Sequence, residues 1–183
     1  MASYVASSNI CRALVNGETP YLSVDPVPAA AASVPTDQLR ATLLDEGADM
    51  WSRYGAMFAL RNRGPGPEVA SVLGTVLTSS ASALLKHEVC YVLGQIQEQG
   101  ASGGAGDALR ATLEDTGEHP MVRHEAAEAI GSIAAGGGST AGLLRRYLAD
   151  ADRIVAESCQ VALDIMATEI SGEFVPLQAA VEA

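Results

Sequence analysis

Apolar side chains recur every three or four residues in four segments of the chain, which is the pattern of a helix with one buried face. Placed under one another, the segments align small and apolar residues in the same order. They are RYGAMFALRN from Arg53, KHEVCYVLGQI from Lys86, RHEAAEAIGSI from Arg123 and AESCQVALDI from Ala156. Their second residues stand at 54, 87, 124 and 157, so the unit repeats after 33, 37 and 33 residues.

A second amphipathic segment precedes each of these four helices. The four are LRATLLDE from Leu39, EVASVLGTVL from Glu68, DALRATLED from Asp107 and AGLLRRYLAD from Ala141. Glycine and proline mark the turns between segments, at 64–67, 100–106 and 136–138, and Pro120 suits the first turn of a helix. The pattern predicts an all-α fold, an α-solenoid of about four helix pairs, because a single pair cannot bury its own apolar face.

The repeats also predict how the chain is divided. We expect a repeat array over 38–171 and a proline-rich, extended linker over 17–37, which holds four of the eight prolines. Residues 1–16 are too short for a helix pair, and we expect them to be the remnant helix of a preceding repeat. Residues 172–183 are expected to form an irregular or loosely docked C-terminal tail.

Composition narrows the classes of function. Apolar residues make up 48% of the chain but aromatic residues only 4%, which favours helices packed through aliphatic side chains over an all-β fold. A formal charge of −11 argues against nucleic acid as a partner; it fits a basic ligand or serves solubility alone. No long apolar run indicates a membrane span or a signal peptide. The odd, widely spaced cysteines Cys11, Cys90 and Cys159 favour reduced thiols in a cytoplasmic protein.

Two histidine–glutamate pairs occupy the same register of consecutive repeats: His87 with Glu88, and His124 with Glu125. Equivalent positions on adjacent helices lie about 10 Å apart on one surface, so these side chains can converge. Imidazole and carboxylate together suit iron, manganese or zinc, and such a set with open positions is typical of oxygen-activating iron sites. The alternative, solvent-facing or hydrogen-bonded pairs without a metal, stays open on spacing alone.

The surroundings of these pairs exclude one common zinc motif. HExxH requires a second histidine four residues after the first, but Tyr91 and Glu128 stand at those positions. Glu128 lies one turn from His124 and is either a carboxylate that supports the metal ligand or a solvated side chain. The third histidine, His119, falls in a turn without such a context.

Several of these strings resemble deoxyhypusine hydroxylase, a family of HEAT-repeat proteins. The resemblance spans roughly residues 10–178 and covers the C-terminal half of that family together with the joint between its halves. It is carried by PYLSVDP from Pro20, RYGAMFALRN from Arg53, SALLKHEVCYVLGQIQ from Ser82, HPMVRHEAAEAIGSIA from His119 and ESCQVALD from Glu157.

The resemblance implies a HEAT-repeat α-solenoid and a deoxyhypusine monooxygenase, which uses molecular oxygen to hydroxylate deoxyhypusine on a translation initiation factor and so completes hypusine. The cofactor implied is a di-iron centre, of which this chain holds half of the ligands. His87 and His124 would bind one iron, and Glu88 would reach the other. Glu125 is expected to hold the substrate amine, or to serve as a further metal ligand.

Half a ligand set leaves three alternatives for the chain. As an enzyme subunit it would pair with a second copy or with a separate partner that carries the N-terminal half. As a non-catalytic HEAT-repeat module it would bind a basic protein segment through its acidic surface. As a fragment it would belong to a longer chain that carries the other two His-Glu pairs.

Overall fold

The computed structural model describes residues 25–96, 104–133 and 138–171, and these residues form helices joined by turns, without strands. No helix within these described residues combines the length and the hydropathy needed to span a membrane. In chain order they are α2 (Thr36–Leu44), α3 (Met50–Arg61), α4 (Pro67–Ser79), α5 (Ala83–Gln95), α6 (Ala105–Glu114), α7 (Pro120–Ile133), α8 (Gly138–Arg146) and α9 (Arg153–Ser171).

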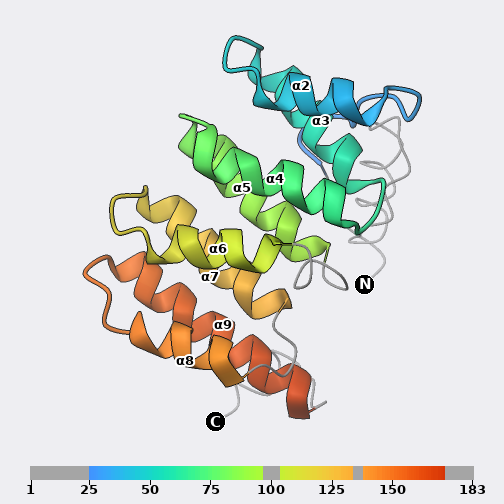
Figure 1. The fold of residues 1–183 in the computed structure, drawn as a ribbon. Coiled ribbons are helices and arrows are strands. Elements are labelled where there is room, and N and C mark those ends of the chain that lie inside the picture. Colours follow the sequence, from blue (N-terminus) through green and yellow to red (C-terminus); the bar gives the residue numbers. More distant parts are fainter. Residues whose placement is uncertain (1–24, 97–103, 134–137, 172–183) are drawn as a thin grey trace, which may run out of the picture.

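The helices pair in sequence order and the pairs stack into four layers (Figure 1). The layers are α2–α3, α4–α5, α6–α7 and α8–α9, and within the stack α7 packs between α5 and α9. Aliphatic side chains from every layer join one continuous core. The predicted fold, an α-solenoid of about four helix pairs, is therefore confirmed.

The described part of the proline-rich segment, residues 25–35, packs against the first layer. Val27 is buried there, and the backbone nitrogen of Ala30 donates to the carbonyl oxygen of Gly55 on α3 at 2.9 Å. Asp25 forms a buried ion pair with Arg61 at 2.5 Å. Helix α2 begins at Thr36, directly after this segment. The expected remnant helix at 1–16 and the tail at 172–183 lie outside the described residues.

The same aspartate turn precedes the second helix in three layers. The side chains of Asp45 and Asp115 each accept from the backbone nitrogen of a glycine two residues later, at 2.9 Å. Asp150 makes the equivalent bond to the nitrogen of Asp152 at 2.9 Å. Because aspartate at this position imitates a backbone turn, the second helices start in a common register.

A basic residue precedes the histidine register position in the first three layers and makes contacts within its own layer and with the next. Arg53 and Arg123 each donate from Nε to the carbonyl oxygen ten residues earlier, at 3.0 Å. Arg123 also pairs with Asp150 at 2.6 Å, and Lys86 pairs with Glu118 at 2.6 Å. Both acidic partners lie in the turn before the next second helix, so these pairs fix how consecutive layers are rotated.

Small residues let the second helices approach closely. A Cβ atom added to Gly131 on α7 would lie 2.8 Å from Ala162 on α9, and one added to Gly94 on α5 would lie 3.2 Å from Ala129 on α7. Arg61 occupies the equivalent position on α3, seven residues after the histidine register, and is fully buried. The close approach therefore holds for α5, α7 and α9, while a large side chain fills the seam between α3 and α5.

Candidate metal centre

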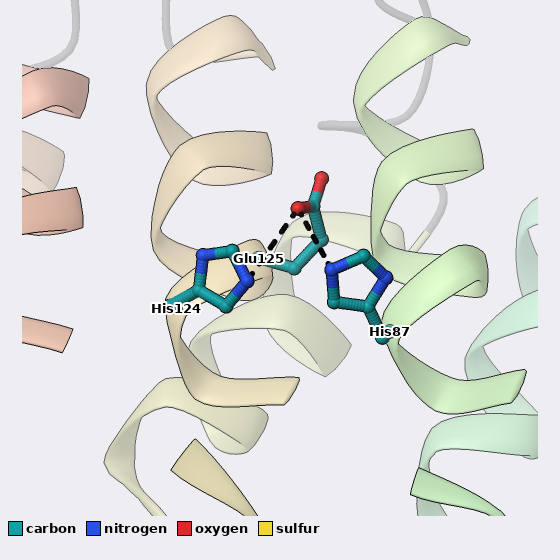
Figure 2. A group of neighbouring side chains, drawn as sticks. All are labelled: His87, His124 and Glu125. Atoms are coloured by element: carbon teal, nitrogen blue, oxygen red, sulfur yellow. Dashed lines mark ion pairs between the residues drawn. The ribbon is translucent and has the colours of Figure 1, made fainter. Parts of the chain in front are cut away.

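The close packing of α5 and α7 brings the two predicted histidines close together. The ring centroids of His87 and His124 lie 5.2 Å apart, with the ring planes inclined by 46°. Figure 2 shows the rings projecting from neighbouring helices toward the same space. The two side chains thus converge on one side of the stack, which the repeat register predicts.

Glu125 is the third member of this cluster, and its carboxyl group lies between the two rings (Figure 2). Its Oε2 atom lies 3.4 Å from Nε2 of His87 and 4.0 Å from Nε2 of His124. Each of the three residues offers one ligand atom, and these atoms all lie within 4.8 Å of one another. Two imidazoles and a carboxylate at this spacing can hold a single divalent cation such as iron, manganese or zinc.

Burial gives an independent indication that a cation fits. The side chains of His124 and Glu125 are only 12% and 11% exposed, and that of His87 is 26% exposed. His124 Nε2 is buried and makes no hydrogen bond within the described residues. A buried polar nitrogen without a partner costs about 1–3 kcal/mol, and a metal ion at the cluster would remove that cost.

The same burial disfavours the charged forms of Glu125 and His87 when no metal is bound. It raises the pKa of the Glu125 carboxyl to about 7, with the charges of Glu128 and Glu88 adding to the shift. It also lowers the pKa of His87, and the neighbouring His124 lowers it further. A cation would reverse the effect on Glu125, because it stabilises the ionised carboxylate.

Glu88, the fourth predicted ligand, lies outside this three-residue cluster. Burial raises its pKa, the charge of Asp25 raises it further, and Arg61 lowers it. The charge of Glu88 in turn adds to the burial that raises the pKa of Tyr54 to about 12. Glu88 therefore lies within electrostatic range of the first layer, where the buried pair of Asp25 and Arg61 is found, and of Glu125 in the cluster.

Behind His124 lie two polar side chains, Glu128 on α7 and Ser158 on α9. Ser158 Oγ lies 3.3 Å from His124 Nδ1 and donates to Glu128 Oε1 at 2.8 Å. Glu128 Oε1 itself lies 3.5 Å from His124 Nδ1. The sequence pattern gave Glu128 a candidate role but none to Ser158, which stands at the register of Glu88 and Glu125 in the last repeat.

Comparison with known families agrees with this architecture. HEAT repeats match residues 70–164, more than half of the chain. Deoxyhypusine hydroxylase of Xenopus laevis is 52% identical over 156 residues, which are 85% of this chain and 48% of that protein. Deoxyhypusine hydroxylase-B of Oryza sativa is 46% identical over 155 residues, which are 85% of this chain and 49% of that protein.

A solved structure shows the same relation in three dimensions. The structure of human deoxyhypusine hydroxylase in complex with glycerol aligns with a TM-score of 0.73 and 46% sequence identity. The alignment covers 82% of this chain and 49% of the human chain, so the chain spans about half the length of the relatives it matches. The chain therefore belongs to the HEAT-repeat family and is similar to one half of deoxyhypusine hydroxylases.

Proposed function

We propose that this chain forms one half of a deoxyhypusine monooxygenase, an oxidoreductase that hydroxylates a deoxyhypusine side chain with molecular oxygen. Its substrate would be the deoxyhypusine-containing translation initiation factor. The observation that carries the proposal is the cluster of His87, His124 and Glu125, with a buried nitrogen that lacks a partner, in a chain similar to that enzyme family.

Iron is the cofactor we propose for this cluster. His87 and His124 would hold one iron through their Nε2 atoms, which both face Glu125 Oε2. Glu88, which lies outside the cluster, is the residue of this chain left to reach a second iron. When bound, a di-iron centre supplies the electrons that activate molecular oxygen.

Glu125 suits either of two roles, metal ligand or substrate carboxylate. It lies against both imidazoles, and its pKa of about 7 means that its charge depends strongly on a nearby cation. A metal ion or the ammonium group of the substrate would both ionise it by direct attraction. If His87 and His124 hold the same iron without help from Glu125, we favour substrate binding as the role of Glu125.

The di-iron centre needs a second body, because the three ligand atoms can hold one iron with positions left open and provide none for another. That body would be a second copy of the chain or a separate partner with the other half. An exposed apolar residue stands three positions before the histidine register on each of the helices α3, α5 and α7. These residues are Trp51, Leu84 and Met121. Such a stripe beside an incomplete site fits a surface that another half covers.

The test measures bound iron and hydroxylation together. Wild-type protein reconstituted anaerobically with iron(II) should retain the metal, alone or with its partner half, and should hydroxylate the deoxyhypusine protein only when oxygen is admitted. The variants His87→Ala and His124→Ala should lose both properties. His119→Ala is the matched control, because Nδ1 of His119 only accepts from the backbone of Met121 in the turn before α7.

A protein that stays monomeric and metal-free after reconstitution, with every candidate partner present, would contradict the proposal. Binding of a basic protein segment that survives the double substitution of His87 and His124 would instead identify the chain as a non-catalytic module. Its formal charge of −11 provides the attraction that such a module needs.

A further inference from the structure

Glu128 and Ser158 touch the imidazole of His124 on the edge away from the cluster. Ser158 lies on α9. This helix approaches α7 within van der Waals contact because Gly131 on α7 has no Cβ atom. The Ser158 side chain reaches His124 Nδ1 at 3.3 Å and Glu128 Oε1 at 2.8 Å. The three groups therefore form a chain of polar contacts that ends on the ring of a proposed metal ligand.

Counting hydrogens along this chain fixes the state of the ring. Ser158 Oγ donates to Glu128 Oε1, so this contact uses the one hydrogen of the Ser158 hydroxyl. Ser158 Oγ can then offer only a lone pair to His124 Nδ1, and Nδ1 must carry a hydrogen to bond with it. In the neutral ring this leaves Nε2 with its lone pair free, and Nε2 is the buried nitrogen without a partner.

We propose that Glu128 and Ser158 are positioning residues that hold His124 as its Nδ1–H tautomer and so aim the Nε2 lone pair at the cluster. The importance of this tautomer for metal binding rests on the proposed function. The tautomer itself does not, because the contacts that set it lie entirely within the chain. Neither residue is a metal ligand in this proposal.

Each substitution then has its own expected effect. Glu128→Ala frees the Ser158 hydroxyl to turn and donate to Nδ1, which drives the ring toward the Nε2–H tautomer. Glu128→Gln keeps an amide oxygen that accepts from Ser158, and it should preserve the tautomer although the charge is gone. Ser158→Ala should have a smaller effect than Glu128→Ala, because Glu128 Oε1 at 3.5 Å can accept from Nδ1–H directly after a small shift.

The first measurement is the nitrogen NMR spectrum of histidine-labelled, metal-free protein at about pH 8, where imidazole is neutral. Two-bond proton–nitrogen correlations distinguish the tautomers, and the variant His124→Gln identifies the signals of this ring. We expect the Nδ1–H form in the wild type and in Glu128→Gln, and a shift toward Nε2–H in Glu128→Ala. A wild-type ring that is mainly Nε2–H, or one that Glu128→Ala leaves unchanged, overturns the proposal.

The second measurement is a cobalt(II) titration of the full chain, followed by the visible absorption of the bound ion. Glu128→Ala should weaken binding by about 10–100-fold, and Glu128→Gln should restore most of that loss. Ser132→Ala is the matched control, since Ser132 Oγ bonds to the backbone carbonyl of Glu128 and not to the ring. Equal losses in Glu128→Ala and Glu128→Gln would mean that charge alone matters and would overturn the positioning role.

The two measurements separate this inference from the proposed function. Wild-type protein that binds no cobalt contradicts the metal site, while its NMR spectrum still decides whether Glu128 and Ser158 set the tautomer. Wild-type protein that binds cobalt with an Nε2–H ring before binding supports the metal site and contradicts the positioning role.

Discussion

Glu125 combines burial with the nearby charges of Glu128 and Glu88, and this combination ties its ionisation to folding. Its pKa of about 7 lies above the ordinary value of 4.5. Between these values the folded chain keeps a proton that the unfolded chain has already lost. The contribution of Glu125 to stability is therefore intact below about pH 4.5 and falls as the pH rises toward 7.

Replacing Glu125 by glutamine should remove this pH dependence from the metal-free protein. We expect the free energy of unfolding of the wild type, relative to Glu125→Gln, to fall by on the order of 2 kcal/mol between about pH 5 and pH 8. Urea unfolding of both proteins in the presence of a chelator measures the difference. The control Glu157→Gln should change little, because Glu157 is exposed and pairs only with exposed Arg153.

Parallel pH profiles for the wild type and Glu125→Gln would show that Glu125 ionises as freely in the folded chain as in the unfolded one. Water would then reach the Glu125 carboxyl more freely than the 11% exposure of its side chain indicates. An added divalent metal gives a second check, because it should restore stability at pH 8 only in the wild type.

At the scale of the helices, the spacing between α7 and α9 depends on one glycine. A methyl group at position 131 would lie 2.8 Å from Ala162, closer than real Cβ contacts allow. The helices can accommodate it only by moving apart. That movement would withdraw Ser158 from His124, so a packing change becomes a change at the candidate site.

Gly131→Ala should therefore destabilise the protein by about 1–3 kcal/mol, despite the higher helix propensity of alanine. Thermal or urea unfolding measures the loss. Gly142→Ala is the matched control: Gly142 lies in α8, a Cβ atom there meets nothing within 4 Å, and the substitution should stabilise by about 0.5–1 kcal/mol. Equal stabilisation by both substitutions would show that α7 and α9 are not in tight contact.

Much of the fold could be predicted from the sequence because its signal is periodic. Repetition of one apolar pattern near every 35 residues specifies helix pairs, and stacking follows from their unpaired faces. The packing of 25–35 carries no such signal. The ion pair between Asp25 and Arg61 joins residues far apart in the sequence, and only the folded first layer brings them together.

The candidate site was predictable in part for the same reason. His87 and His124 share a register, so their convergence follows from the stacking of equivalent helices. Which glutamate joins them does not follow, because residues i and i+1 of a helix point about 100° apart and the rotation of each helix decides. The pattern assigns Ser158 no role because its repeat has no histidine, although its register position matches that of Glu125.

At the scale of the whole molecule, the chain presents the open side of its cluster beside an exposed apolar stripe. Trp51, the single tryptophan of the chain, belongs to this stripe and is 62% exposed. Leu84 and Met121 continue it on the next two layers. A body that completes the candidate metal site from this side has to cover the stripe.

Tryptophan emission should therefore report assembly. In the isolated monomer Trp51 should emit at the long wavelengths of a hydrated indole, and assembly with another half should shift the emission to shorter wavelengths. We expect the shift to rise with protein or partner concentration, in parallel with the mass measured by sedimentation. Leu84→Glu should move the emission shift and the increase in mass to higher protein concentration, because a charge would enter an apolar interface.

An emission spectrum that stays constant while the mass doubles would place the contact on another surface. The exposed substitution Arg153→Glu, at the start of α9 and outside the stripe, serves as a charge control. It should leave the association unchanged.

The seam between the first two layers has a consequence for how this stack responds to force. Where α5, α7 and α9 approach through glycine and alanine, α3 meets α5 across the bulk of Arg61, whose guanidinium reaches Gln95 at 3.1 Å. Helix α3 touches α5 over a smaller contact than α5 shares with α7 or α7 with α9, so less dispersion attraction holds the first seam together. Pulled from its two ends, the stack should part at this seam first and shed α2 and α3 as a unit, leaving the histidine-bearing helices joined.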